Sequence, residues 1–219
     1  METDRLIEQL SAGLTPVRPL PSPAGRLAGW LAASVPALAV VTLGFGLRPG
    51  LGGLFASPGF VLELAGALLT GLLGGYAALC AVVPDQPSWK LWLPVAPMSL
   101  WLGTLGQQCL EVALRIGPDG LRVTSDAMCL PAIALGGIVP AVAMTILLRR
   151  ARGVRTTHAC FCGALAAAAL GAAALRLYHP QDAAIMVIVW QVGSVALLSL
   201  AAGALGRLLV ARAPEIAPA

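Results

Sequence analysis

Long apolar segments alternate with short polar ones along the whole chain. Each apolar segment is long enough to cross the hydrocarbon core of a bilayer, which takes roughly 20 residues in a helix. The six predicted spans are Gly25–Leu47, Gly59–Val83, Lys90–Leu114, Leu130–Leu148, Ala159–Leu177 and Ala183–Val210. We therefore predict an all-α polytopic membrane protein whose transmembrane domain is a six-helix bundle.

Residues 1–24 precede the first span and have a different pattern. Apolar residues recur there at helical spacing, at Leu6, Ile7, Leu10 and Leu14, which predicts a short amphipathic helix. Prolines 16, 19, 21 and 23 follow and favour a stiff, extended linker. The apolar stripe either lies on the membrane surface or enters a groove on a soluble partner. The predicted organisation is an arm over 1–24, the transmembrane domain over 25–210 and a tail over 211–219.

Composition supports the same class of protein. Hydrophobic residues make up 58% of the chain, charged residues 11%, and the mean hydropathy is +0.85. These values lie outside the range of soluble domains. The segments that connect the predicted spans are short, so we expect no soluble catalytic domain. The arm contains Glu2, Asp4 and Glu8 and has no apolar core, so we do not expect a cleavable signal peptide.

The distribution of basic residues predicts the orientation. With the N-terminus inside, 10 of the 14 Lys and Arg residues lie on the inner side and 4 on the outer side. Because basic residues in short loops stay in the cytoplasm, this favours both termini inside. The net charge of +4 is then a signal of topology, and we expect no binding of nucleic acid.

Few polar groups interrupt the predicted spans, and nearly all of them fall towards the outer ends. They are Glu63, Gln107, Gln108, Glu111, Arg176 and Gln191. A charge in lipid is costly unless it is paired or faces water. We therefore expect Arg176 to form an ion pair with either Glu63 or Glu111, and we find little support for an ion pathway across the membrane.

Small residues recur at four-residue spacing on two spans. Ala67, Gly71 and Gly75 form one line, and Gly163, Ala167 and Gly171 form the other. Such lines let helix backbones approach closely in lipid. The sequence therefore predicts a compact bundle, with a homodimer interface as the alternative.

Cys109, Cys129 and His179 fall at the outer ends of the predicted spans. Thiolate and imidazole suit a soft metal ion, and the two thiols suit a redox signal. We therefore treat the three residues as candidates for sensing, with Cys129 and His179 as the possible metal ligands. The alternative is that Cys109 is a buried helix residue and His179 an ordinary turn residue.

Several short motifs, taken together, resemble the NrsF-type negative regulators of sigma F over essentially the whole chain. They are Thr3-Asp4-Arg5-Leu6-Ile7, Pro16-Val17-Arg18-Pro19-Leu20, Gly46-Leu47-Arg48-Pro49, Leu93-Pro94, Ala96-Pro97, Leu100-Trp101-Leu102, Ser125-Asp126, Pro180-Gln181-Asp182 and Val189-Trp190. The resemblance implies an inner-membrane anti-sigma factor of six helices in bacteria. Such a protein holds an extracytoplasmic-function sigma factor inactive and releases it on an envelope stress such as heavy metal or oxidant.

The resemblance also implies a pair of outer cysteines that sense the stress. Cys129 matches the first position, before the fourth span, whereas His179 stands where the family pattern has a cysteine before the proline. This departure leaves a mixed Cys-His metal site, or use of Cys109, as alternatives to a disulfide between the two positions. We expect no bound cofactor.

Two other classes of protein compete with this interpretation. A small transporter or channel for a metal or small solute would use the proline-containing third and fourth spans to line a path, but the sequence shows no charged residue at the midplane and no obvious inverted repeat. A membrane enzyme would need a nucleophile and a base at suitable spacing, and none is evident.

Overall fold

Helices make up the elements of the computed structural model, which describes residues 2–12, 20–117, 123, 129–149, 155–179 and 184–210. The side chains of Glu2, Cys129 and residues 207–210 are outside this description, as is the predicted tail, 211–219. The elements are α1 (Glu2–Ser11), α2 (Pro23–Phe45), α3 (Leu51–Leu54), α4 (Pro58–Ala81), η1 (Ser88–Trp92), α5 (Val95–Ile116), α6 (Cys129–Arg149), α7 (Thr156–Tyr178), α8 (Ala184–Met186), η3 (Val187–Val192) and α9 (Gly193–Val210).

Five helical segments are long and apolar enough to cross a membrane. They are Pro23–Phe45, Pro58–Ala81, Leu130–Arg149, Thr156–Tyr178 and Ala184–Gly206. The all-helical prediction is thus confirmed for the described residues, together with five apolar helices that match predicted spans. The third predicted span forms α5, which is 22 residues long but carries Gln107, Gln108, Glu111 and Arg115. The count of six spans and the orientation stay predictions.

Proline and glycine set the ends of several helices. The Ser22 hydroxyl accepts a hydrogen bond from the Gly25 N–H at 3.2 Å, and Pro23 occupies the first turn of α2, where its missing N–H costs nothing. At the other end, Gly46 adopts a φ of 82° and terminates α2. In the third span, α5 begins at Val95, later than predicted. Pro94 and Pro97 have no N–H to donate, and at the start of α5 this loss breaks no hydrogen bond of the helix.

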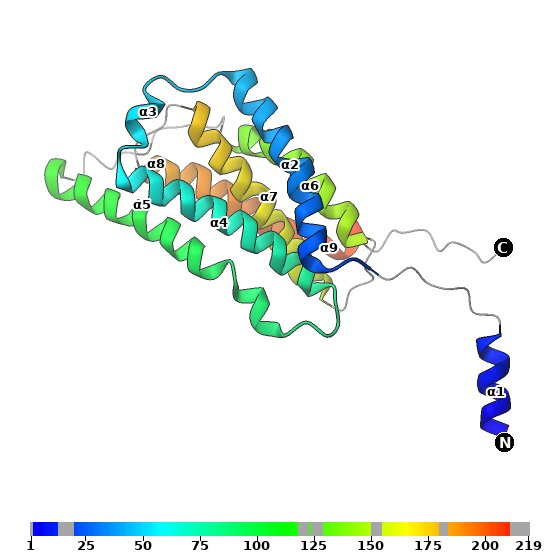
Figure 1. The fold of residues 1–219 in the computed structure, drawn as a ribbon. Coiled ribbons are helices and arrows are strands. Elements are labelled where there is room, and N and C mark those ends of the chain that lie inside the picture. The colour runs from blue at the N-terminus through cyan, green and yellow to red at the C-terminus, as the bar shows by residue number, and fades with distance from the viewer. Residues whose placement is uncertain are drawn as a thin grey trace.

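Helix α7 lies in the middle of the bundle, packed along α4, α6 and α9 (Figure 1). Small residues allow this close packing. A Cβ added to Gly71 of α4 would lie 2.8 Å from Cδ2 of Leu170, and one added to Gly171 of α7 would lie 2.8 Å from the carbonyl oxygen of Ile133 in α6. Both glycines belong to the lines predicted from the sequence, and their contacts are made within the bundle.

Two hydrogen bonds join α2 to α6. The Arg26 Nη2 donates to the carbonyl oxygen of Leu147 at 2.6 Å, and the Trp30 Nε1 donates to that of Pro140 at 2.8 Å. Trp30 is 1% exposed and also packs on α4, since a Cβ at Gly75 would lie 2.9 Å from the Trp30 ring. The beginning of α2 and the end of α6 therefore lie at the same end of the bundle.

The last predicted span is interrupted by a π-helical segment. The sequence predicts one continuous helix, whereas the structure has α8, the π-helix η3 and then α9. Gln191 of η3 is 1% exposed, and neither its amide nitrogen nor its amide oxygen has a hydrogen-bond partner in the described part of the chain. A π-helical turn has one more residue than an α-turn at the same place, which changes the face that each following residue presents.

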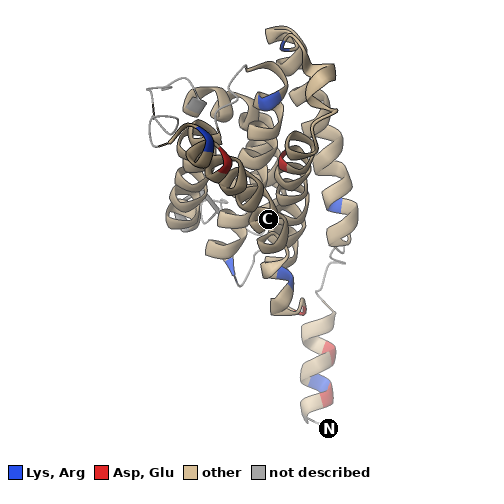
Figure 2. Cartoon of the chain, turned by 90° about the vertical axis from the view of Figure 1, so that its left-hand side faces the viewer, with Lys and Arg blue, Asp and Glu red and all other residues tan. Residues whose placement is uncertain are grey.

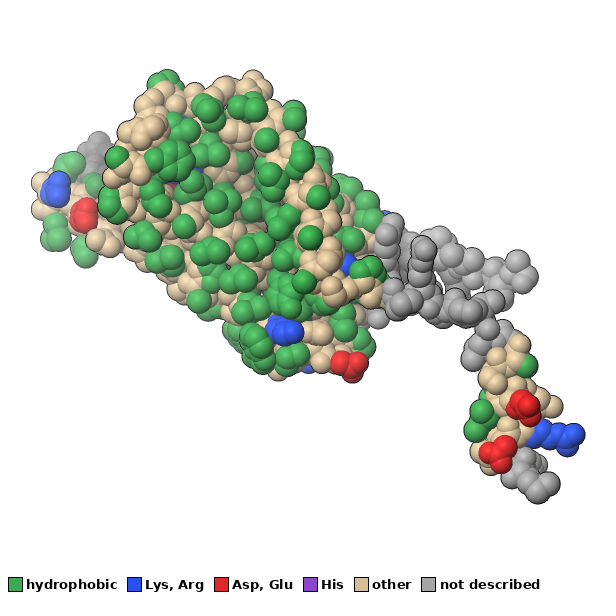
Figure 3. Space-filling view, in the orientation of Figure 1, with side chains coloured by type: hydrophobic (Ala, Val, Ile, Leu, Met, Phe, Trp, Pro, Cys, Tyr) green, Lys and Arg blue, Asp and Glu red, His purple; other side chains and the backbone are tan. Residues whose placement is uncertain are grey.

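The outer surface of the bundle is apolar. Hydrophobic side chains cover most of the face seen in Figure 3. Large apolar residues that are more than half exposed include Val40, Leu43, Ile138 and Leu200. Charged side chains are sparse on the bundle, and α1 carries both signs (Figure 2). A surface of this kind is suited to contact with lipid hydrocarbon.

Candidate functional site

Helix α1 presents an uncovered apolar stripe. It lies apart from the bundle (Figure 1), and Leu6, Ile7 and Leu10 are 55%, 60% and 68% exposed. The predicted fourth member, Leu14, lies outside the described residues, as does the linker over 13–19. Asp4, Arg5 and Glu8 are also exposed, and they fall on the opposite face at 100° per residue. The stripe is therefore available to a membrane surface or to a partner.

The candidate sensing residues lie on or next to three different helices. His179 directly follows α7, where its backbone N–H donates to the carbonyl oxygen of Leu175 at 2.8 Å. Cys129 is the first residue of α6, and its side chain lies outside the described residues. Cys109 is a free, half-buried thiol on α5, packed against a cluster of buried residues that includes Ala184 and Val187.

A cavity of about 360 Å³ lies between His179 and the first turns of α6. It is lined by His179, by Pro131, Ala132 and Leu135 of α6, and by Phe45, Leu175 and Tyr178. The tertiary structure thus brings His179 next to the first turn of α6, which begins at Cys129. Among the described residues, no three His, Cys, Asp or Glu side chains group as metal ligands. The metal site and the sensing roles stay predictions.

A buried ion pair lies between α4 and α7. The Arg176 Nε is 2.7 Å from Glu63 Oε1, and the Arg176 Nη2 donates to Glu63 Oε2 at 3.2 Å. Glu63 is 2% exposed and Arg176 5%. The guanidinium also lies over the ring of Phe60, 5.5 Å from its centroid. Of the two partners that the sequence allowed for Arg176, the structure selects Glu63.

This ion pair forms part of the wall of a polar cavity of about 450 Å³ between α4, α5 and α7. The other lining residues are Leu54, Ser57, Pro58, Gly59, Phe60, Leu62, Thr104, Gln107, Gln108 and Glu111. The sequence did not single out Ser57 or Thr104; it singled out Glu63, Gln107, Gln108, Glu111 and Arg176 separately, but not their convergence. Their common position near the same ends of the predicted spans was the signal in the sequence that could have indicated this convergence.

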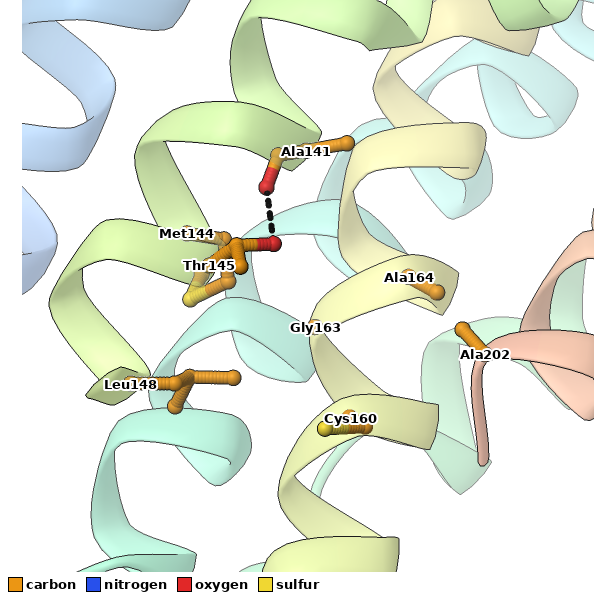
Figure 4. Close-up of a pocket in the computed structure, with 8 residues that line it drawn as sticks. All are labelled: Ala141, Met144, Thr145, Leu148, Cys160, Gly163, Ala164 and Ala202. Carbon is orange, nitrogen blue, oxygen red and sulfur yellow. Dashed lines mark hydrogen bonds between the residues drawn. The ribbon is translucent and has the colours of Figure 1, made fainter. Parts of the chain in front are cut away.

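A smaller, apolar cavity lies between α6, α7 and α9 (Figure 4). Its volume is about 150 Å³, and its lining residues are Ala141, Met144, Thr145, Leu148, Cys160, Gly163, Ala164 and Ala202. The Thr145 hydroxyl donates to the carbonyl oxygen of Ala141 at 2.8 Å. Thr145 contributes the one hydroxyl among these lining residues and none of them is charged, so the cavity has little capacity to recognise a polar ligand.

The sequence was also compared with known proteins. Residues 10–211 match the NrsF family, described as negative regulator of sigma F. No curated protein and no solved structure matches the chain. The match begins at the end of α1 and includes every helix of the bundle, which confirms the resemblance seen in the motifs. The chain therefore belongs to the NrsF family of negative regulators of sigma F.

Proposed function

We propose that this protein is a bacterial inner-membrane anti-sigma factor, which sequesters an extracytoplasmic-function sigma factor on its N-terminal arm. The sigma factor binds the apolar stripe formed by Leu6, Ile7, Leu10 and Leu14. Envelope stress, in the form of a heavy metal or an oxidant, weakens this binding. The sigma factor then dissociates and can direct transcription.

The observation that carries the proposal is the exposure of the α1 stripe in a member of this family. Among the described residues of the bundle, large apolar side chains either pack in its core or lie on its apolar outer surface. An amphipathic helix on a linker is a common ligand for a hydrophobic groove, and its apolar side chains act as anchors at helical spacing. A sigma factor is the partner that the family description implies.

The proposed topology has six crossings, with both termini inside. The end of α2 lies near the end of α7, since Phe45 stacks on Tyr178 with ring centroids 5.1 Å apart. The start of α6 belongs to the same end, next to His179. The end of α4 belongs to the opposite one, because Gly75 packs on Trp30 near the start of α2. Helix α5 joins the end of α4 to the start of α6, which lie at opposite ends of the bundle. We therefore assign α5 as a membrane crossing, which brings the total to six.

The signal enters at the outer end of the bundle, at Cys129, His179 and Cys109. The bundle has two arrangements in this proposal. A ligand or an oxidation at these residues shifts the equilibrium between them only if it stabilises one arrangement more than the other. Helix α6 begins at Cys129 and ends beside Arg26, close to the point where the arm joins α2. A displacement of α6 would thus reach the arm through the Arg26 and Trp30 hydrogen bonds.

Deletion of residues 2–20 tests the proposal. In cells carrying a reporter of the sigma factor encoded nearby, we expect the deletion to make transcription constitutive although the bundle still accumulates in the membrane. The full-length chain is the control. Unchanged repression by the deleted form at equal membrane abundance would contradict the proposal.

Labelling of single cysteines tests the topology. A cysteine placed at residue 2 should resist a membrane-impermeant maleimide in intact cells and react after lysis. Reaction in intact cells would place the arm in the periplasm, where it cannot reach a sigma factor.

A further inference from the structure

The polar cavity between α4, α5 and α7 has the features of a ligand site that the sigma-factor interaction does not use. Its volume of about 450 Å³ falls in the usual range for small-molecule sites, roughly 300–1,000 Å³. It lies near the beginning of α4 and the ends of α5 and α7. In a membrane-spanning bundle, helix ends lie at the depth of the lipid head groups.

The charges lining this cavity leave an excess of one negative charge. Glu63 and Arg176 neutralise each other through their two-point contact. Glu111, on the α5 side, is the remaining charged group among the lining residues. Its Oε1 accepts a hydrogen bond from Gln107 Nε2 at 3.3 Å, which helps to hold the carboxylate near the cavity.

The neutral polar groups of the wall add further acceptors. The Thr104 hydroxyl donates to the carbonyl oxygen of Trp101 at 2.8 Å, so its oxygen lone pairs can accept a bond from a ligand. Gln108 and Ser57 contribute an amide and a second hydroxyl. Leu54, Phe60 and Leu62 give the same cavity an apolar portion. The wall is thus suited to a cationic donor attached to a short carbon chain.

We propose that this cavity binds the primary ammonium group of an amine, with Glu111 as its counter-charge. An ammonium offers three N–H donors and no acceptor, which complements a wall of one carboxylate, amide oxygens and hydroxyls. Both the head group of an aminophospholipid and a free small amine carry this group. Since α5 forms one wall and the α4–α7 ion pair another, the bound amine joins α5 to the centre of the bundle and stabilises it.

The test uses the full-length protein in nanodiscs, with thermal unfolding as the readout. Phosphatidylcholine discs have no primary ammonium, and discs containing phosphatidylethanolamine supply one. We expect phosphatidylethanolamine to raise the unfolding temperature by about 3–6 °C for each tenfold of preferential binding, which corresponds to about 1.4 kcal/mol. Ethanolamine titrated into phosphatidylcholine discs separates the sources: a matching rise indicates a free amine, and no rise alongside a lipid effect indicates the lipid.

Matched variants assign the effect to the cavity. Glu111→Gln removes the charge and keeps the shape, and it should abolish the rise or weaken ethanolamine binding by at least about tenfold. Asp85→Asn removes an exposed carboxylate between α4 and η1, away from the cavity, and should leave the rise intact. Absence of a rise with both probes in the wild type, or a full rise in Glu111→Gln, would overturn the proposal.

Discussion

Helices α1 and α7 place their apolar side chains in opposite environments. In α7, Leu165, Leu170 and Leu175 are 5%, 6% and 1% exposed, and alanine or glycine fills most of the positions between them. In α1, each described member of the stripe is more than half exposed. The apolar residues of α7 are therefore committed to holding the bundle together, whereas those of α1 contribute no burial within the chain.

The difference teaches that the two helices satisfy different requirements. Helix association in lipid depends on close approach at small residues, and α7 supplies such residues along its length. Helix α1 instead has large apolar side chains next to charged ones, a pattern that gains stability only on contact with another surface. Changes in α7 should thus act on the bundle, and changes in α1 on partner binding alone.

The largest effect is expected from Gly171→Val in α7. A Cβ at this position lies 2.8 Å from the carbonyl oxygen of Ile133 and 3.2 Å from the backbone nitrogen of Gly137. Since these are backbone atoms, α6 and α7 must separate, at a cost of at least about 3 kcal/mol. Gly29→Val is the control, because a Cβ there meets nothing within 4 Å. Thermal unfolding in detergent compares the two, and equal unfolding temperatures would refute the central role of α7.

Glu63→Gln should have the next largest effect. It leaves the buried Arg176 guanidinium without its counter-charge, which costs about 3 kcal/mol. Glu63→Leu combined with Arg176→Met should recover part of this loss, because no buried charge is left. Glu111→Gln, measured in phosphatidylcholine, is the control: Glu111 is exposed, so its removal should cost less than about 1 kcal/mol. Equal destabilisation by Glu63→Gln and Glu111→Gln would show that the buried ion pair contributes no more to stability than an exposed carboxylate does.

Trp30→Phe, in α2, should lower the free energy of unfolding by a smaller amount. It keeps an aromatic ring against Gly75 but removes the N–H that donates to Pro140, at a cost of about 1 kcal/mol. Trp92→Phe is the control, since Trp92 is 72% exposed. Denaturant unfolding followed by circular dichroism measures both. A loss no greater than that of the control would mean that this hydrogen bond contributes no stability.

The smallest effect on the bundle is expected from serine at Leu6, Ile7 and Leu10 together. Because these side chains are exposed, the unfolding temperature should stay at the wild-type value. Binding of the sigma factor should fall at least tenfold, since each apolar side chain buried in a groove contributes about 1.5–3 kcal/mol. Glu8→Gln with Gln9→Ala changes the opposite face and should retain binding. Co-purification from membranes measures both variants, and retained binding by the serine variant would locate the interface elsewhere.

The helices could be predicted from the sequence because lipid imposes a local rule. Every backbone group in a span must be satisfied within its own helix, so a long apolar run such as Pro58–Ala81 identifies a span without reference to its neighbours. The arm could be recognised in the same way from its periodicity. The third span is harder to assign, because Gln107, Gln108 and Glu111 lower its hydropathy and their environment depends on α4 and α7.

The candidate sites could be predicted only in part. The sequence limited the partner of Arg176 to two glutamates, but the choice of Glu63 depends on the rotation of α4 against α7. It placed Cys129 and His179 at one end of the bundle, and the structure adds that His179 shares a cavity with the first turn of α6. The π-helix around Gln191 has no local signature that distinguishes it from the continuous helix predicted there.

By itself, the sequence determined that the chain forms apolar helices, that a charged and amphipathic segment precedes them, and which polar residues lie near the ends of these helices. These properties follow from the periodicity and hydrophobicity of each segment alone. Only the tertiary structure decided that α7 occupies the centre, that Glu63 holds Arg176 and that a polar cavity opens beside them. Those outcomes depend on how small residues on several helices set the distance and rotation between neighbours, which no single segment specifies.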